Sequence, residues 1–325
     1  MNISSGQTQN NMKLRNLLLT VCAMIVFCNC QSYRPTYLSV ASYNLRNANR
    51  GDSTEGNGWG QRYPMIAQMV QYHDFEIFGT QECFSHQLED MKKALPGYDY
   101  IGVGRDDGKQ KGEHSAIFYR TDKFDVLEKG DFWLSETPDV PSKGWDAVLP
   151  RICSWGHFRC KDTGFEFLFF NLHMDHVGKK ARVESAFLVQ KKMQEFGSSL
   201  PAILTGDFNV DQTHQSYDAF VSKGVLCDSY EKSDFRFAPN GTFNSFNPNN
   251  FTESRIDHVF VSPVFHVKRY GVLTDTYRSA KGTGEKAKVK DCPEEISIKA
   301  YQARVPSDHF PVKVELEFSK RQKKQ

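Results

Sequence analysis

The stretch PSDHFPV (residues 306–312) places an Asp-His pair between two prolines and leads directly into the run VKVELEF (312–318). Apolar and polar residues alternate in that run, which predicts a strand with one buried face. A strand entrance rarely needs a carboxylate and an imidazole side by side. Asp308 could cap the backbone amides of a turn, or Asp308 and His309 could carry chemistry, and the rest of the sequence has to decide.

Further apolar runs predict strands along the chain, and helical patterns separate some of them. Strands that alternate with helices favour an α/β fold, whereas neighbouring runs joined by the short KDTG segment favour an antiparallel hairpin. The sequence therefore predicts mixed sheets with helices outside. The predicted strands cover residues 37–45, 75–80, 114–119, 152–160, 165–173, 201–208, 255–262 and 310–318, and the predicted helices cover 61–73, 86–95 and 179–196.

Polar side chains stand at the ends of six of these apolar runs. A buried polar group costs free energy unless it is paired, so polar groups at six strand ends indicate a shared functional role. Sites in α/β proteins form where strand ends converge and loops begin, and we expect these side chains to meet at one site. They are Asn44; Gln81 and Glu82; Asn171, His173 and Asp175; Asp207 and Asn209; Asp257; and Asp308 with His309.

The residue types in this set indicate metal-assisted hydrolysis. Carboxylates and amide oxygens with few soft ligands suit a hard cation, Mg²⁺ or Mn²⁺. Histidines beside them can transfer protons near neutral pH, and asparagine amides can stabilise a developing oxyanion. The combination fits the attack of water on phosphorus. The sequence has neither a GxSxG nucleophile elbow nor a GxxxxGK[ST] phosphate loop, which argues against those two classes of site.

Seven motifs, taken in order, resemble those of the endonuclease/exonuclease/phosphatase superfamily. GDFN and SDH in the correct order with the glutamate motif are strongly indicative, although each alone is weak. The resemblance runs from about Tyr37 to Phe318 and implies a DNase I-like fold, a four-layer α/β sandwich of two packed mixed β-sheets flanked by helices. The motifs are SYNLR (42–46), TQE (80–82), GVGRDDGKQKGEHSAIFYR (102–120), NLHMDH (171–176), TGDFN (205–209), RIDHVF (255–260) and PSDHFPV (306–312).

This resemblance implies a metal site at three matching positions. Glu82 would be the principal ligand of Mg²⁺, with Mn²⁺ as an alternative. Asn44 would help to hold the metal or its water and would also border the substrate. Asp308 would lie near the metal or its waters, so the resemblance favours chemistry over the turn cap at this residue.

The resemblance implies catalytic roles for five further residues. Asp207 would orient or deprotonate the attacking water, and Asn209 would bind phosphate oxygens. His309 would be the catalytic histidine, oriented by the carboxylate of Asp257. His173 matches a second phosphate-contacting position. Whether Asp207 or His309 is the base stays open at this point.

Four more polar residues are candidates for substrate binding. Arg105 and Glu113 could line a pocket beside the metal, although an ordinary charged hairpin would have the same residues. His176 follows the NLHMDH strand end. Arg182 could bind a phosphate, and an arginine on a helix surface is an equal alternative.

The balance of basic and acidic residues limits which substrates are expected. Among 325 residues, 41 are Lys or Arg and 39 are Asp or Glu, so the basic surplus that typifies nonspecific nucleic-acid binders is missing. We predict a metal-dependent hydrolase of phosphate esters, first a nuclease-like phosphodiesterase, a 3′–5′ exonuclease included. The alternatives are a phosphomonoesterase or sphingomyelinase-like enzyme, and a catalytically silent ligand-binding protein on the same fold. The expected binding partner of the protein is its phosphate-ester substrate, which could be a nucleotide or a nucleic acid. No obligate protein partner is expected.

The N-terminus predicts export. Lys13 and Arg15 precede an apolar run over residues 17–28 that is short for a membrane span and typical of a secretory signal. Residues 1–30 are therefore expected to be a signal peptide or lipoprotein signal, and residues 31–325 a single domain. Cys28 or Cys30 could carry a lipid anchor. The predicted location is the periplasm or cell surface, with free secretion as the alternative.

Overall fold

The computed structural model describes residues 36–197, 199–222, 224–280, 290–291, 293 and 295–318. The described residues belong to one compact unit that starts at Thr36. The predicted signal at residues 1–30 lies outside them, so the signal and the domain boundary at residue 31 remain predictions. Within the described ranges, no helix combines the length and the apolar character that crossing a bilayer requires.

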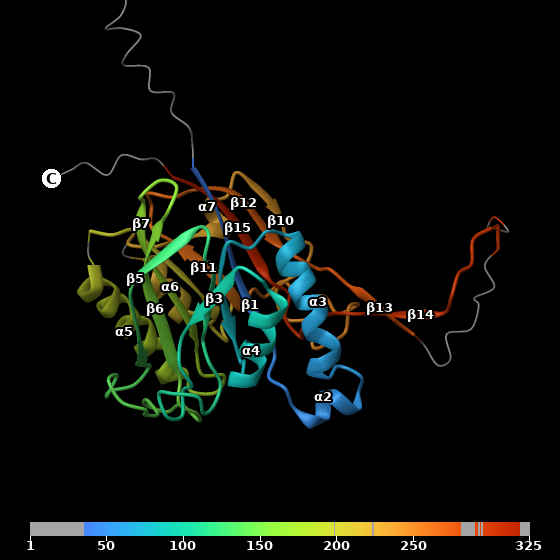
Figure 1. Cartoon of the computed structure of the whole chain (residues 1–325). Helices are drawn as coiled ribbons and strands as arrows, with labels where there is room; N and C mark the ends of the chain where they lie inside the picture. Colours follow the sequence, from blue (N-terminus) through green and yellow to red (C-terminus); the bar gives the residue numbers. More distant parts are fainter. Residues whose placement is uncertain are drawn as a thin grey trace, which may run out of the picture. The chain divides into compact units, whose positions relative to one another are not determined.

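Two mixed β-sheets form the centre of the described part of the chain (Figure 1). In spatial order, one contains β10 (Phe235–Phe237), β12 (His266–Val272), β15 (Val312–Phe318), β1 (Thr36–Asn44), β2 (Ile77–Gln81), β4 (Ile117–Arg120) and β3 (Tyr98–Ile101). The other contains β5 (Phe124–Trp133), β6 (Ile152–Cys160), β7 (Glu166–His173), β8 (Ala202–Asp207), β11 (Asp257–Val261) and β9 (Cys227–Asp228). A separate hairpin pairs β13 (Tyr277–Ala280) with β14 (Tyr301–Arg304).

Helices cover the outer face of each sheet and complete the four layers. Buried residues of α3 and α4 pack on the outer face of the sheet that contains β1, and those of α5 and α6 pack on the outer face of the sheet that contains β7 (Figure 1). The predicted α/β sandwich is thereby confirmed. The helices are α2 (Arg50–Thr54), α3 (Trp59–Tyr72), α4 (Ser85–Ala94), α5 (Lys179–Gly197), α6 (Gln215–Val221) and α7 (Ser229–Lys232).

Alternation along strands such as β1 and β7 builds three apolar layers. In β1, Val40 faces the other sheet while Tyr43 faces the helices. In β7, Phe169 meets the opposite sheet and Phe170 lies under α5. Successive side chains of a strand point to opposite faces, so strands that are buried on both faces appear as continuous apolar runs. These are the runs that the sequence displays.

The face between the sheets changes from apolar to polar toward one edge. Following the inward positions of β8, Ile203 leads to Thr205 and then to Asp207, all buried. The neighbouring strand β7 carries Phe169 and then His173 on the same face. The apolar half of each row holds the sheets together, and the polar half ends at a common edge.

Asn171 joins the two sheets just below that edge. Its Nδ2 donates to the carbonyl oxygens of Thr80 (2.8 Å) and Ala116 (3.0 Å), and its Oδ1 accepts from Gln81 Nε2 (2.7 Å). A Cβ on Gly79 would lie 2.2 Å from Asn171 Oδ1, so this amide fits because residue 79 is a glycine. Asn171, a polar strand end in the sequence, therefore links the sheets and does not line the pocket described below.

Candidate active site

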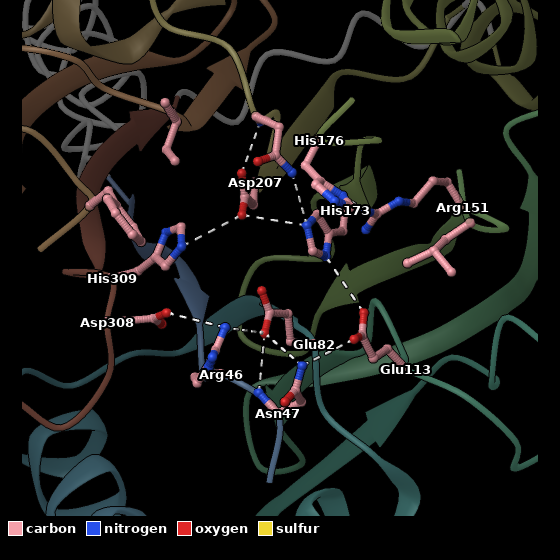
Figure 2. A pocket seen from close by; sticks show the side chains of 14 residues that line it. Arg46, Asn47, Glu82, Glu113, Arg151, His173, His176, Asp207, Asp308 and His309 are labelled. Atoms are coloured by element: carbon pink, nitrogen blue, oxygen red, sulfur yellow. Dashed lines mark hydrogen bonds and ion pairs between the residues drawn. The ribbon is translucent and has the colours of Figure 1, made fainter. Parts of the chain in front are cut away.

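A pocket of about 470 Å³ opens at the polar edge of the two sheets (Figure 2). Both sheets and the loop before β15 contribute to its wall, so residues far apart in sequence meet there. Its lining residues are Arg46, Asn47, Glu82, Glu113, Leu149, Arg151, His173, His176, Asp207, Asn209, Phe243, Ile256, Asp308 and His309.

Strand register brings the predicted residues to this edge. Parallel pairing sets His173 of β7 beside Asp207 of β8, and antiparallel pairing sets Asp257 of β11 on the other side of Asp207. In the other sheet, Asn44 of β1 pairs with Gln81 of β2, and Glu82 follows directly. Because parallel strands end at the same edge, one register fixes several functional groups at once.

The chain turns sharply where three of these strands end. Arg46, Glu82 and Asn209 all have left-handed backbones, with φ of 58°, 67° and 51°. Non-glycine residues adopt this region uncommonly, at a cost of about 1–3 kcal/mol in strained cases. The strain is tolerated here because neighbouring hydrogen bonds hold each residue, and all three side chains line the pocket.

His309 is held between two carboxylates. Its Nδ1 lies 2.8 Å from Asp257 Oδ2, and its Nε2 lies 3.8 Å from Asp207 Oδ2. Asp257 is fully buried and His309 is nearly so. Burial lowers the pKa of His309, but the nearby carboxylates, Asp257 first, outweigh it and raise that pKa well above the usual range. His309 is therefore poised as an imidazolium.

His173 has the opposite electrostatic environment. Burial, together with the positive charges of Arg151 and Arg105, lowers the pKa of His173 well below its usual range. Its Nε2 lies 3.0 Å from Asn209 Nδ2, which can only donate, so the ring is neutral and accepts there. Asn209 Nδ2 also donates to the Met174 carbonyl at 2.9 Å, which leaves both of its N–H groups engaged.

Asn44 connects the carboxylates of the two sheets. Its Nδ2 donates to Glu82 Oε1 (3.1 Å) and to Asp207 Oδ2 (3.0 Å), while its Oδ1 accepts from the Arg46 N–H (2.9 Å). The amide nitrogen, and not the oxygen, thus faces the predicted metal position. Arg46 Nη1 lies 3.9 Å from Glu82 Oε2 and 3.5 Å from Asp308 Oδ2, so its charge stands between those two acids.

The donor set fits a divalent cation. Glu82, His173 and Asp207 each offer a ligand atom within 4.8 Å of the others. Burial raises the pKa of Asp207, to about 7, and also raises the pKa of Asp308. Ionising these buried carboxyl groups therefore costs free energy, and a hard cation bound by carboxylate oxygens would offset that cost.

Arg151 forms a second group at the far side of the pocket and was missed from the sequence. It is 3% exposed and its Nη1 has no hydrogen-bond partner among the described residues. Its Nε lies 3.3 Å from Asp175 Oδ2, and its Nη2 donates to His176 Nδ1 at 2.9 Å. His176 must then carry its ring proton on Nε2, which makes it a donor.

The four substrate-binding candidates have different positions. Glu113 and His176 line the pocket. Arg105 does not line it, and its guanidinium is paired with Glu113. Arg182 does not line it either, since its Nη1 donates to the Asp175 carbonyl at 2.9 Å. Arg105 and Arg182 thus contact the site through Glu113 and Asp175.

Two buried residues that the sequence did not indicate fix the loops of the site. Arg62 donates to the carbonyl oxygens of Leu45 (2.7 Å) and Pro306 (3.0 Å), which joins the end of β1 to the Asp-His segment. Gln87 accepts from the Ala48 N–H at 2.8 Å. Both lie within helices whose sequences carry no motif, so no local sequence feature would have predicted their role. Asn47 could have been found, because it follows the SYNLR motif directly.

Comparison with known proteins gives a family match and close structural relatives. The sequence profile of the Endonuclease/Exonuclease/phosphatase family matches residues 41–309. A crystal structure of an endonuclease/exonuclease/phosphatase family protein from Bacteroides thetaiotaomicron is 80% identical, with a TM-score of 0.82 over 88% of this chain and 100% of that one. A mannosyl-6-phosphatase from the same species is 80% identical, with a TM-score of 0.80 over 86% of this chain and 99% of that one.

The curated relatives are more distant. An uncharacterised protein of Acanthamoeba polyphaga mimivirus is 32% identical over 160 residues, which are 47% of this chain. The chain spans 60% of the length of that protein and 14% of a second one from the same virus.

Proposed function

The chain belongs to the Endonuclease/Exonuclease/phosphatase family, and we propose that within it this protein is a divalent-cation-dependent phosphomonoesterase that removes the phosphate from C6 of a mannosyl or closely related sugar. The resemblance inferred from the motifs is confirmed, and the chain is a phosphate-ester hydrolase of this family. The sequence alone favours a phosphodiesterase and keeps the phosphomonoesterase as an alternative. Two observations reverse that order.

The first observation carries the proposal. The relative named mannosyl-6-phosphatase is 80% identical to this chain over 99% of its own length. Identity at that level leaves few positions at which the two pockets can differ. Because one fold hosts many activities, this close relative supports the proposed substrate and the shared fold does not.

The second observation is the positive charge at the far side of the pocket. A terminal phosphate carries more charge than the phosphate of a diester, and a buried arginine beside a donor suits it. Arg151 and His176 provide these two groups in the pocket wall. The near-balance of 41 basic and 39 acidic residues adds no field that would attract a polynucleotide.

The proposed cation site uses the carboxylates of Glu82 and Asp207, with Asp308 beside them, because the lone pair of His173 Nε2 is already engaged by Asn209. When bound, Mg²⁺ or Mn²⁺ would stabilise charge on the phosphate oxygens and lower the pKa of a water molecule. Asn44 joins the carboxylates of Glu82 and Asp207 through its two hydrogen bonds and so fixes them relative to each other.

The protein residues divide the proton chemistry between them. The raised pKa of His309 favours its protonated form, so we assign to Asp207 the proton that leaves the attacking water. The water oxygen bonds to phosphorus, the bond from phosphorus to the sugar oxygen breaks, and that oxygen leaves with a proton from solvent. His309 donates a hydrogen bond to a phosphate oxygen, and Asn209 fixes the neutral ring of His173.

We extend the proposal to location, on the strength of the N-terminal sequence. Residues 1–30 would direct export, and the mature chain would act in the periplasm or at the cell surface, with a lipid on Cys28 or Cys30 as the anchored alternative to free secretion. Mass spectrometry of the protein from its natural host would test this. A mature protein that begins at Met1 would contradict it.

The activity is tested with a substrate panel and purified full-length protein in Mg²⁺. The panel holds mannose 6-phosphate, glucose 6-phosphate, a simple aryl phosphodiester, single-stranded RNA and DNA, and sphingomyelin. We expect phosphate release from the sugar monoesters, with mannose 6-phosphate preferred. Cleavage of the diesters or nucleic acids in its place would restore the phosphodiesterase interpretation.

A matched pair of variants assigns the activity to this pocket. Glu82→Gln removes a proposed metal ligand, and we expect kcat/KM to fall by about a hundredfold or more. Glu128→Gln makes the same chemical change at an exposed position of β5 and should leave kcat/KM unchanged. Equal activity of the two variants would place the chemistry elsewhere.

A further inference from the structure

A second pocket adjoins the first and shares two residues with it. Its volume is about 280 Å³, and Phe243 and Ile256 belong to both pockets. The Phe243 ring meets the His309 ring edge-on, with centroids 5.1 Å apart. When the phosphate of a substrate occupies the first pocket, the rest of that substrate therefore passes Phe243 before it reaches the second pocket.

The second pocket is pre-formed by a hydrogen-bonded loop. Asn240 Nδ2 donates to the Asn250 carbonyl (2.7 Å), and the Thr252 N–H donates to Asn240 Oδ1 (3.0 Å). The loop is also fixed to the catalytic segment, because the Asn244 N–H donates to the Asp308 carbonyl (2.8 Å). Ordering of this loop costs little when a ligand binds, since these bonds already exist.

The lining of the second pocket indicates the chemistry of its ligand. Phe243 and Phe251 are 42% and 70% exposed, so they offer aromatic surface to a ligand. Asn250 and Thr252 add amide and hydroxyl groups, and none of the described residues that line this pocket is charged. Asn244 Oδ1 accepts from the Phe246 N–H, whereas its buried Nδ2 has no partner among the described residues.

These properties favour a neutral sugar ring over the next nucleotide of a strand. The C–H face of a pyranose packs on aromatic rings, and its hydroxyls pair with amides and hydroxyls. A nucleic-acid strand would bring another phosphate to this position and would need a cation there. The volume of about 280 Å³ is at the small end for ligand pockets and suits one ring.

We infer that the second pocket binds the sugar unit adjoining the phosphorylated one, so that a phosphorylated oligosaccharide is a better substrate than a free sugar phosphate. This inference rests on the proposed function, since it assumes that a sugar phosphate occupies the first pocket. Phe243 contacts the phosphorylated unit and Phe251 contacts its neighbour.

The test compares two substrates with the full-length protein in Mg²⁺. One is mannose 6-phosphate, and the other is a mannose disaccharide with its phosphate on C6 of the terminal sugar. We expect kcat/KM for the disaccharide to be about tenfold higher, mostly through KM. Phe251→Ala should reduce that ratio to about one, while Phe251→Tyr keeps it. Phe251 is largely exposed, so its truncation should not unfold the protein.

Phe235→Ala is the matched control, because Phe235 is 61% exposed on β10 and lines neither pocket. It should preserve the ratio. A wild-type ratio near one, or a high ratio that survives Phe251→Ala, overturns the inference and leaves the phosphatase proposal standing. Failure to hydrolyse either sugar phosphate, with activity on other esters, overturns the proposed function itself.

Discussion

His173 and His309 approach the same oxygen of Asp207 from two sides, at 3.5 Å and 3.8 Å (Figure 2). Their pKa values are displaced in opposite directions, since burial and arginine charges lower that of His173 while carboxylates raise that of His309. Such separation of neighbouring titrating groups is how one site holds both a neutral and a protonated imidazole at the same pH. Asp207 therefore has a hydrogen-bond acceptor ring on one side and a donor ring on the other.

The raised pKa of His309 predicts the alkaline limit of activity. Protonated His309 is the active form in the proposed mechanism, so the rate should be lost as pH rises through that pKa. Asp257→Asn removes the charge that raises it most, and the alkaline limb should move to lower pH while kcat falls about 10²- to 10⁴-fold. A pH profile of kcat for both proteins tests this. An unmoved limb would show that another group sets it.

Cation binding should stabilise the fold, and more strongly at higher pH. Without a cation, burial raises the pKa of Asp207 from 3.8 to about 7, so the folded state binds more protons than the unfolded state between those values. Stability of the cation-free protein should therefore fall as pH rises across that window. We expect the Mg²⁺-induced increase in Tm to be larger at pH 8 than at pH 5, and to vanish in Glu82→Gln. An equal increase at both pH values would contradict this account.

Arg151 should contribute to substrate affinity. A hydrogen bond to a charged partner is worth about 1.5–3 kcal/mol, so Arg151→Lys, which loses the planar fork, should raise KM for mannose 6-phosphate by about 10- to 100-fold. Steady-state kinetics check this, and the Tm of the variant shows whether the buried contact with Asp175 survives. If KM stays constant while kcat falls, Arg151 acts on the transition state and not on binding.

The amide that joins the sheets should make Gly79 intolerant of substitution. A Cβ at residue 79 would lie 2.2 Å from Asn171 Oδ1 and 2.3 Å from Thr205 Oγ1, so Gly79→Ala should destabilise the fold by about 1–3 kcal/mol. Gly60→Ala is the control, because nothing lies within 4 Å of a Cβ there and α3 favours alanine. Urea unfolding of both variants measures their free energies of unfolding and tests this prediction. Equal stability of the two would show that the sheets can separate slightly without loss.

The sequence predicted strands that are buried on both faces, and also β15, whose buried and polar positions alternate without a break. Among the strands that it missed are two with broken alternation. β1, β7 and β8 were found because both of their faces are apolar. β5 and β12 were missed, and in each the register shifts, between Val126 and Glu128 and between Val267 and Arg269. A bulge places one extra residue in a strand and reverses the alternation beyond it, so a period of two cannot be recognised.

The candidate site was predictable where strand ends carry polar residues and unpredictable where loops do. Glu82, Asp207 and His309 follow or precede apolar runs and lie in the pocket together. Arg151 lies in a loop before β6, and only the fold brings it to His176. Arg182 follows the motif that His176 ends, but its guanidinium donates to a backbone carbonyl. The helical periodicity of a sequence predicts on which face of the helix a residue lies, but it does not predict where the end of a long side chain points.

The ligand set is divided between the two sheets, with Glu82 from one and Asp207 from the other. Strands of the two sheets also interleave along the chain, since β10, β12 and β15 return to the first sheet after β9 has joined the second. Severing the chain between β4 and β5 would leave an N-terminal fragment that lacks Asp207 and three of the seven strands of its own sheet. Enzymatic turnover should therefore report complete assembly, and inactivation by heat should coincide with global melting.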